Sequence, residues 1–394
     1  MKILFISARL PYPLNNGAKI RAYHLLKTLS RIHQVTLLTF CGNEGERSYF
    51  PEIESLGVRI VPLLNPNIDK PVGFRDLLQN LFSPLPLTVR KYCTPVMGEM
   101  ISSILTEGYN AVHCEHLHVA HYLWNVPQIR KAMDAHNVEA QIAERHAAVE
   151  RNPLKRIILR WNAGKMLEYE MKAVRSMDLV LAVSGNDQAT FRKQGGDNAR
   201  VLENGVDLSY FLPQETPVNK KSVFVGSMDW APNVDGIIYF IAEILPLIRS
   251  VHPDFELSVT GKAPPSHLIA LTASDPLLHV TGTVDDVRPY IADASVYIVP
   301  LQFGGGTRLK ILEAFAMGKA VVSTSLGCEG IDCRDGEHIM IADTPREFAD
   351  AVIRLLADSE LKKRISANAA QLVKERYGWK TIGARLLAYY EEIA

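Results

Sequence analysis

The sequence has few cysteines, and they form no motif. Five are scattered over 394 residues, and none belongs to a C-x-x-C pair. We therefore expect reduced thiols in a cytosolic protein and no disulfide framework. Long apolar runs are also missing, because no stretch approaches 18 apolar residues and the N-terminal apolar segment is too short for a signal peptide. These absences exclude a disulfide-rich secreted domain and predict no membrane-spanning helix.

Net charge is absent as well, since 43 Lys and Arg balance 43 Asp and Glu. A dedicated nucleic-acid-binding protein would be strongly basic, so this class is excluded. The balance conceals an asymmetry, because residues 1–212 carry 25 basic and 20 acidic side chains, whereas residues 213–394 carry 18 and 23. An asymmetry of this kind indicates two parts with different partners.

Two glycine motifs of nucleotide-binding proteins are missing too. No G-x-G-x-x-G follows an apolar segment, and there is no G-x-x-x-x-G-K-[ST]. We therefore expect neither a dinucleotide cofactor nor phosphoryl transfer by a P-loop. Ser184 lies in no G-x-S-x-G motif, so we expect it to cap a helix and not to act as a nucleophile.

Short apolar segments rich in β-branched residues alternate with helix-length segments along the whole chain. They are 2–7, 35–40, 58–64, 111–116, 132–138, 179–184 and 199–206, then 222–227, 255–261, 277–284, 295–301, 319–325 and 338–343. Continuous apolar strands separated by helices predict parallel sheets that are covered on both faces. We therefore expect an α/β protein of two doubly wound, Rossmann-like domains, with ligands at the carboxyl ends of the strands.

The polar segment 207–222, which contains two prolines, is the best break in this pattern. It predicts an N-terminal domain at 1–212 and a C-terminal domain at 213–376, facing each other across a cleft. A last helix at 377–394 could cross back onto the first domain.

The most informative motif is Gly304-Gly305-Gly306-Thr307, between a predicted strand and a helix that begins at about Arg308. Glycines and a helix N-terminus let backbone N–H groups surround an anion, and Arg308 and Lys310 add two positive charges. This combination suits the diphosphate of a leaving nucleoside diphosphate. The alternative is a flexible loop with solvated cations.

Glu313 lies within that helix among apolar residues, and a buried carboxylate needs a partner. The partner could be a ligand hydroxyl, such as that of a ribose, or Lys310 in an i,i+3 ion pair.

In the first domain, Gly17 follows the first strand and would allow a ligand to approach the backbone closely, with Lys19 and Arg21 at the start of the next helix.

Histidines gather in and after the predicted strand 111–116. The cluster comprises His113, His116, His118 and His121, together with Glu115. On a strand His113 and Glu115 share a face, whereas His116 and His118 would need a turn to converge. A metal site, an acid–base or acceptor-site histidine, and histidines with purely structural partners all remain open. We expect His136, after the next strand, at the same sheet edge.

The segment 151–175 carries seven basic and two acidic residues with Ile, Leu, Trp and Met between them. A basic amphipathic helix of this kind can lie on an anionic membrane surface. The alternative is a solvated helix that packs on the core.

At these residues the chain resembles the glycosyltransferase family 4 enzymes of GT-B fold, and most closely a bacterial subgroup associated with exopolysaccharide clusters. The matching segments are 202–211 (LENGVDLSYF), 224–233 (FVGSMDWAPN), 259–265 (VTGKAPP), 279–301 and 304–331. The resemblance implies retaining transfer from a nucleotide-diphosphate sugar, without a metal, in the cleft between the domains.

The resemblance also implies roles for single residues. Glu313 matches the second glutamate of the family's E-x7-E motif, which holds the donor ribose. The first glutamate is replaced by Gly305, which leaves backbone groups of Gly305–Thr307 to contact the sugar. The family's diphosphate-binding Arg and Lys fall at Ser227 and Asn233, so Arg308 and Lys310 are the expected substitutes.

Three further positions follow from the resemblance. Gly226 belongs to the same donor segment as Ser227, and the stretch from Gly282 to Val284 would line the nucleobase. The family's catalytic-site histidine matches His116, with His118 as a rival.

We therefore expect a cytoplasmic glycosyltransferase, in possible peripheral contact with the inner membrane face. Its donor would be a UDP- or GDP-sugar, its acceptor a lipid-linked or oligosaccharide precursor of the cell envelope or of an exopolysaccharide, and it would need neither cofactor nor metal. A nucleotide-sugar epimerase of related fold and a non-catalytic nucleotide-sugar-binding protein are the alternatives.

Overall fold

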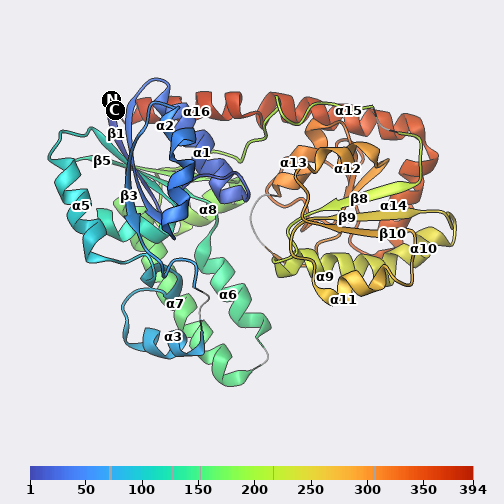
Figure 1. Ribbon diagram of the computed structural model, residues 1–394, viewed down its shortest axis with the longest axis horizontal. Helices are drawn as coiled ribbons and strands as arrows, with labels where there is room; N and C mark the ends of the chain where they lie inside the picture. The colour runs from blue at the N-terminus through green and yellow to red at the C-terminus, as the bar shows by residue number, and fades with distance from the viewer. Residues whose placement is uncertain (71–72, 127, 151, 216, 305–307, 394) are drawn as a thin grey trace. The chain divides into compact units, whose positions relative to one another are not determined.

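A computed structural model describes residues 1–70, 73–126, 128–150, 152–215, 217–304 and 308–393. The chain forms two units, Met1–Glu203 with Gly383–Ala394, and Asn204–Ile382. The division after Glu203 comes before the boundary expected at 212. Each unit is a parallel sheet flanked by helices, which confirms the predicted pair of doubly wound α/β domains (Figure 1).

The sheet of the first unit has seven strands in the order β3-β2-β1-β4-β5-β6-β7, and all neighbouring strands are parallel. They are β1 (Lys2–Ser7), β2 (Gln34–Cys41), β3 (Arg59–Leu64), β4 (Ala111–Glu115), β5 (Arg130–Ala135), β6 (Leu179–Ala182) and β7 (Ala199–Val201). Each coincides with a predicted strand to within a few residues at its ends, since continuous apolar runs are buried on both faces.

The helices of the first unit cover both faces of this sheet. They are α1 (Gly17–Ser30), α2 (Phe50–Glu54), α3 (Phe74–Gln79), α4 (Leu87–Arg90), α5 (Pro95–Leu105), α6 (Glu139–Val149), α7 (Pro153–Ser176) and α8 (Gly185–Lys193), with 3₁₀ turns η1 (Glu44–Tyr49), η2 (Asn80–Phe82) and η3 (Leu117–Leu123). The Ser184 side chain accepts a hydrogen bond from the N–H of Asp187, so Ser184 caps α8 as predicted.

The sheet of the second unit has six parallel strands in the order β10-β9-β8-β11-β12-β13. They are β8 (Lys221–Val225), β9 (Glu256–Thr260), β10 (Leu278–Gly282), β11 (Val296–Val299), β12 (Ala320–Ser323) and β13 (Met340–Ile341). Its helices are α9 (Ala231–Tyr239), the π-helical η4 (Phe240–Ile244), α10 (Leu245–Arg249), α11 (Ser266–Leu271), α12 (Arg288–Asp293), α13 (Leu309–Ala316), α14 (Pro345–Ala357) and α15 (Ser359–Arg376).

One helical segment has the length and mean hydropathy of a membrane span, although it contains no apolar run near 18 residues. Residues Ala231–Arg249 form a continuous helical segment that is long and apolar enough. Its apolar side chains Ile237, Phe240, Ile244 and Ile248 are fully buried in the core of the second unit. The segment therefore serves as a core helix of this unit.

The last helix, α16 (Trp379–Glu392), belongs to the first unit from Gly383 onward. The buried Tyr390 hydroxyl lies 2.7 Å from Nδ1 of His113 on β4. The Tyr389 hydroxyl donates to the carbonyl of Val201 at 3.1 Å. These contacts attach α16 to the sheet of the first unit, as predicted for a C-terminal helix that returns to the first domain.

Candidate functional site

Glycines line the carboxyl edge of the second sheet, where the sequence predicts a ligand. Gly226 follows β8, Gly261 follows β9, Gly282 ends β10 and Gly304 lies beyond β11. A Cβ on Gly261 would lie 1.8 Å from the carbonyl oxygen of Gly226, so these two backbones approach each other in a way that no other residue permits. Gly282 has a φ of 71°, and its carbonyl accepts a hydrogen bond from the N–H of Gly261.

Lys310 points from α13 toward the first of these glycines. Its ammonium donates to Oδ1 of Asn233 at 2.8 Å, and Nδ2 of Asn233 donates to the carbonyl of Ser227 at 2.7 Å. A Cβ on Gly226 would lie 2.5 Å from the Lys310 Nζ and 2.8 Å from Nδ2 of Asn233. The structure thus brings together four predicted donor-site residues, and Asn233, although uncharged, positions the Lys310 cation.

Arg308 immediately precedes α13 and is only 5% exposed. Its guanidinium lies 5.1 Å from the ring centroid of Trp230, and Gly304 has a φ of 123° with Arg308 and Trp230 next to it. Trp230 is a neighbour that the sequence analysis missed, although it lies between Ser227 and Asn233 in a matching segment. The predicted Gly305, Gly306 and Thr307 lie outside the described residues.

Burial brings the pKa values of Lys310 and Glu313, the two ionisable groups of α13, close to 7. Burial, and the nearby charge of Arg308, lower the pKa of Lys310 to about 7. Burial raises the pKa of Glu313 to about 7, although the charge of Lys310 opposes this shift.

Val284, the other predicted nucleobase contact, lies two residues beyond β10 and is half-buried.

These two pKa values predict that binding of a nucleotide sugar weakens above pH 7. As the pH rises, Lys310 loses its positive charge and Glu313 gains a negative one, so the site repels an anionic diphosphate. We expect the affinity for UDP-glucose or GDP-mannose to fall by up to about tenfold per pH unit for each proton that is lost. Titration calorimetry between pH 6 and 9 measures this slope.

The matched control for this slope is Lys310→Met, in which the contribution of Lys310 disappears. A nucleotide-sugar diphosphate is esterified at both ends and has no proton that titrates near pH 7. The change of affinity with pH therefore reports the titration of groups of the protein. An affinity that stays constant up to pH 9 would contradict the assignment of these groups to the donor site.

The first unit contains a pocket of about 260 Å³ at the carboxyl edge of its sheet. Its wall includes Ser7, Ala8, Arg9, Asn16, Ala18, Lys19, Tyr92, Glu115, His116, His118 and His136. His116 has a φ of 79° and lies between β4 and η3, and this turn brings Nδ1 of His116 within 2.6 Å of Nδ1 of His118. The turn that convergence requires is therefore present, and His136 lies at the same edge, as predicted.

Burial, and the charge of His136, lower the pKa of His116 to about 3. Burial also lowers the pKa of His118 well below its ordinary value, and its Nε2 atom has no hydrogen-bond partner among the described residues. Both rings are therefore neutral at pH 7. His121 lies apart from them, because its Nδ1 atom is 3.0 Å from the hydroxyl of Tyr169.

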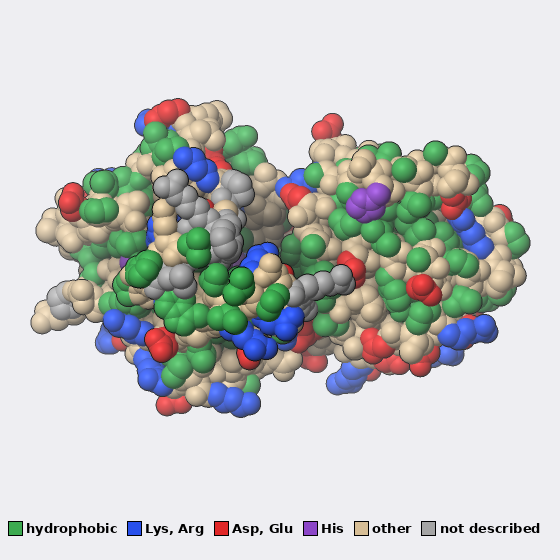
Figure 2. All heavy atoms as spheres, turned by 90° about the horizontal axis from the view of Figure 1, so that it is seen from below, with side chains coloured by type: hydrophobic (Ala, Val, Ile, Leu, Met, Phe, Trp, Pro, Cys, Tyr) green, Lys and Arg blue, Asp and Glu red, His purple; other side chains and the backbone are tan. Residues whose placement is uncertain are grey.

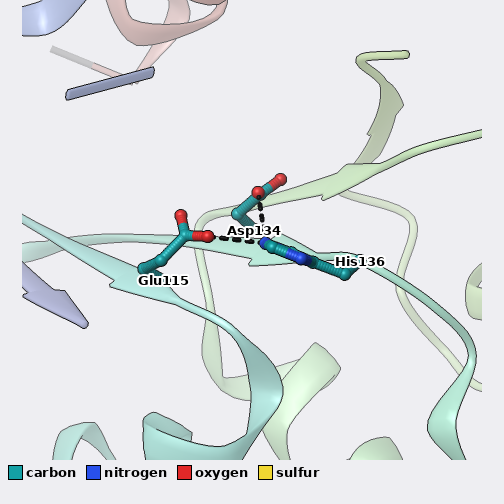
Figure 3. Close-up of side chains that lie close together, drawn as sticks. All are labelled: Glu115, Asp134 and His136. Atoms are coloured by element: carbon teal, nitrogen blue, oxygen red, sulfur yellow. Dashed lines mark hydrogen bonds and ion pairs between the residues drawn. The ribbon is translucent and has the colours of Figure 1, made fainter. Parts of the chain in front are cut away.

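Glu115, Asp134 and His136 form a buried ion network beside this pocket (Figure 3). Nε2 of His136 lies 2.5 Å from Oε1 of Glu115 and 3.2 Å from Oδ2 of Asp134. Burial alone would lower the pKa of His136, but the two carboxylates raise it to about 9. The imidazole is therefore a cation at neutral pH. On the other side, Nε2 of His113 lies 3.3 Å from Oε2 of Glu115, so these two residues share a face as predicted.

Arg21 completes this network. Its Nε and Nη2 donate to the two oxygens of Asp134, both at 2.6 Å, and the side chain is 1% exposed. The guanidinium also donates to the carbonyls of Leu202 and Glu203, both at 2.9 Å. Arg21 does lie near the start of α1, as predicted, but its guanidinium is bound by the buried carboxylate of Asp134 and does not line the pocket. Lys19 does line the pocket, and Gly17 is the first residue of α1.

The same cluster bears on the metal question. Ligand atoms of Glu115, Asp134 and His136 lie within 4.8 Å of one another, and among the described residues this is the group with the geometry to hold a metal ion. However, the two carboxylates are already neutralised by His136 and Arg21. A divalent cation would have to displace these partners, so the residues do not fit a metal site well.

Part of the second unit is similar in sequence to a known protein family. Residues 219–358 match the family described as glycosyl transferases group 1. Over 97% of both chains, the protein is 24% identical to an uncharacterized 44.6 kDa protein in the cps region of Klebsiella pneumoniae. It is 28% identical to a phosphatidyl-myo-inositol mannosyltransferase of Mycobacterium tuberculosis over 50% of this chain and 55% of that one.

Among solved structures, the chain is similar to Alr3699/HepE of Anabaena in complex with UDP-glucose. The TM-score is 0.68 at 15% identity, and the similarity covers 100% of both chains. The fold agrees with the predicted GT-B architecture, and the family match covers most of the second unit, including Arg308, Lys310 and Glu313. The chain therefore has the fold of the GT-B glycosyltransferases, and its residues 219–358 match the family of group 1 glycosyl transferases.

Proposed function

We propose that this protein transfers a sugar from a UDP- or GDP-sugar to a lipid-linked or oligosaccharide acceptor of the cell envelope or of an exopolysaccharide, in the cytoplasm and with retention of anomeric configuration. The observation that carries the proposal is the Lys310–Asn233 hydrogen bond beside Gly226, with Arg308 at the same sheet edge. The buried Arg308 and the half-buried Lys310, next to close-packed glycines, are suited to a diphosphate.

Breaking the anomeric C–O bond leaves negative charge on the diphosphate. Donors that are already in place stabilise this charge, and Lys310 and Arg308 are positioned to supply them. In a front-face retaining transfer the leaving phosphate itself can take the proton of the acceptor hydroxyl. The low pKa of His116 is consistent with that route, because a ring with a pKa of about 3 is a weak base.

The relatives support this choice of substrates. The HepE structure contains UDP-glucose, and the mycobacterial relative is named a mannosyltransferase that acts on phosphatidyl-myo-inositol. The Klebsiella relative lies in a cps region. By analogy, we assign the donor to the second unit and the acceptor to the pocket of the first unit.

A thermal-shift panel of UDP, GDP, ADP, TDP and CDP tests the proposal first. One diphosphate should raise the unfolding temperature clearly more than the others, and the matching nucleotide sugars are then offered with lipid-linked and oligosaccharide acceptors. NMR of the glycosidic product reports its anomeric configuration. Isomerisation of the donor without acceptor would favour the epimerase, and binding without turnover on any acceptor would favour the non-catalytic alternative.

We expect His116→Gln to lower kcat by about tenfold while leaving the affinity for the nucleotide sugar unchanged. Glutamine keeps a polar group but loses the ring that faces the pocket, and the loss corresponds to one hydrogen bond to the acceptor. Steady-state kinetics and calorimetry on the same samples separate the two effects. His118→Gln is the matched variant: a larger loss there than in His116→Gln would assign the acceptor contact to His118.

A further inference from the structure

Helix α7 presents apolar side chains in two directions. Leu159, Met166 and other residues of its inner face are buried. In contrast, Leu154, Ile157 and Trp161 are 73%, 64% and 42% exposed. Their spacing of three and four residues places them on one stripe of the helix. The N-terminal half of α7 therefore carries an apolar stripe that the core does not use.

The turn η2 and the end of α3 lie against the same part of α7. The Lys165 ammonium donates to the carbonyl of Asn80 at 2.7 Å and lies 3.4 Å from the ring centroid of Trp161. Phe82, at the end of η2, is 92% exposed, and Leu78 on α3 is 41% exposed. We call Leu78, Phe82, Leu154, Ile157 and Trp161 the α3–α7 face. Large apolar groups that gather in this way on a surface usually mark an interaction site.

Basic side chains surround this face. Arg160 is exposed and Arg156 is half-buried between the apolar residues of α7. Lys155 forms an ion pair with Glu150 at 2.7 Å. Figure 2 shows hydrophobic side chains gathered on this side of the first unit with Lys and Arg side chains along their border. The α3–α7 face is thus apolar at its centre and positive at its edge.

The position of the face also matters. Helix α3 and the adjoining ends of α6 and α7 project beyond the sheet of the first unit, away from the strand β1 (Figure 1). Protruding apolar side chains can insert into a fluid surface such as a lipid bilayer, which needs no complementary groove. Trp161, with the Lys165 ammonium over its ring, has the amphipathic character of residues that lie at the level of lipid headgroups.

We propose that the α3–α7 face docks on a lipid bilayer that contains anionic lipid. The apolar side chains insert between the headgroups, and Lys155, Arg156 and Arg160 attract the lipid phosphates. Binding of a nucleic acid would use the positive edge of the face but not its apolar centre, so a lipid bilayer fits the face better. The proposal does not rest on glycosyl transfer, because neither the donor site nor the pocket contributes a residue to it.

Co-sedimentation with vesicles tests this proposal, using phosphatidylcholine alone or mixed with phosphatidylglycerol. The full-length protein should bind the mixed vesicles at least tenfold more tightly, and less so at high salt. The triple variant Leu154→Gln/Ile157→Gln/Trp161→Gln should lose at least tenfold in affinity for them, because little apolar area remains to insert. The double variant Lys155→Gln/Arg160→Gln should lose the preference for anionic lipid.

Two control variants carry the same substitutions elsewhere on the first unit. Ile32→Gln/Val96→Gln removes exposed apolar side chains, and Arg192→Gln/Lys193→Gln removes exposed cations of α8, and both should bind like the wild type. The proposal is overturned if the triple variant binds vesicles as the wild type does. It is also overturned if the wild type ignores vesicles and forms a dimer that the triple variant dissociates, because the face would then bind a second copy. Binding of UDP or GDP in the same samples reports the donor site separately.

Discussion

Lys310→Met is expected to lower kcat/KM for sugar transfer by about 10²–10³-fold. This is the loss that follows when one donor aimed at a developing negative charge is removed. Methionine retains an apolar stem, whereas the ammonium group, which lies 2.8 Å from Oδ1 of Asn233 and 4.2 Å from the ring centroid of Phe224, disappears. The affinity for the nucleotide sugar should fall as well, because the diphosphate is charged before the reaction begins. Steady-state kinetics and calorimetry measure the two losses.

Stability provides the first control for this variant. The pKa of Lys310 is lowered to about 7, so burial of its charge does not stabilise the fold, and Lys310→Met should not lower the unfolding temperature. Lys220→Met is the matched variant, since Lys220 forms an exposed ion pair with Asp254 in the same unit. If Lys310→Met is folded and retains wild-type turnover, the assignment of the diphosphate to this site is wrong.

Arg21→Met is expected to destabilise the first unit by about 3–5 kcal/mol, the usual result of breaking a buried ion pair on one side. The carboxylate of Asp134 would remain buried with His136 as its other ionic partner, and the carbonyls of Leu202 and Glu203 would lose a donor. Because the protein has two units, a single unfolding curve would mix their transitions. Hydrogen exchange of β5 and β6, followed by mass spectrometry, reports the first unit alone.

A double-mutant cycle tests whether this loss belongs to the Arg21–Asp134 pair. Asp134→Asn removes the charge that Arg21→Met leaves behind, so the double variant should be clearly more stable than the sum of the two single losses predicts. Arg31→Met, at the exposed end of α1, controls for the loss of a cation from the same helix. Strict additivity of the two single variants would contradict the ion-network interpretation.

The contrast between Lys310 and Arg21 shows which site residues can be located from the sequence and which cannot. The apolar runs identify the strands, and in parallel sheets the strand ends determine where ligands bind, so Gly304 and Lys310 could be placed at this edge in advance. Gly226 was implied by the family resemblance. Arg21 could not be placed, because its partner Asp134 is 113 positions away in the sequence and lies on another strand. The weak signal was Asp134 itself, a charged residue inside an apolar strand.

The histidines show a second limit of the sequence. His116 converges with His118 because the backbone at His116 adopts a φ of 79°. A positive φ is usually signalled by a glycine in the sequence, and this position has none. Nor could the sequence show that one histidine of this edge is a cation and two are neutral. That difference depends on which rings reach the carboxylates of Glu115 and Asp134.

The return of α16 to the first unit makes that unit discontinuous in sequence, and this has a practical consequence. The N-terminal amine lies 3.4 Å from Nδ1 of His33, whose ring is 6.5 Å from that of Tyr390, so the two chain ends are neighbours (Figure 1). A circular permutant with a short linker between the old ends and new termini between Glu203 and Asn204 would contain each unit as one uninterrupted stretch. Only the peptide bond between Ile382 and Gly383 would then connect the two units, and cleavage there would release each of them whole.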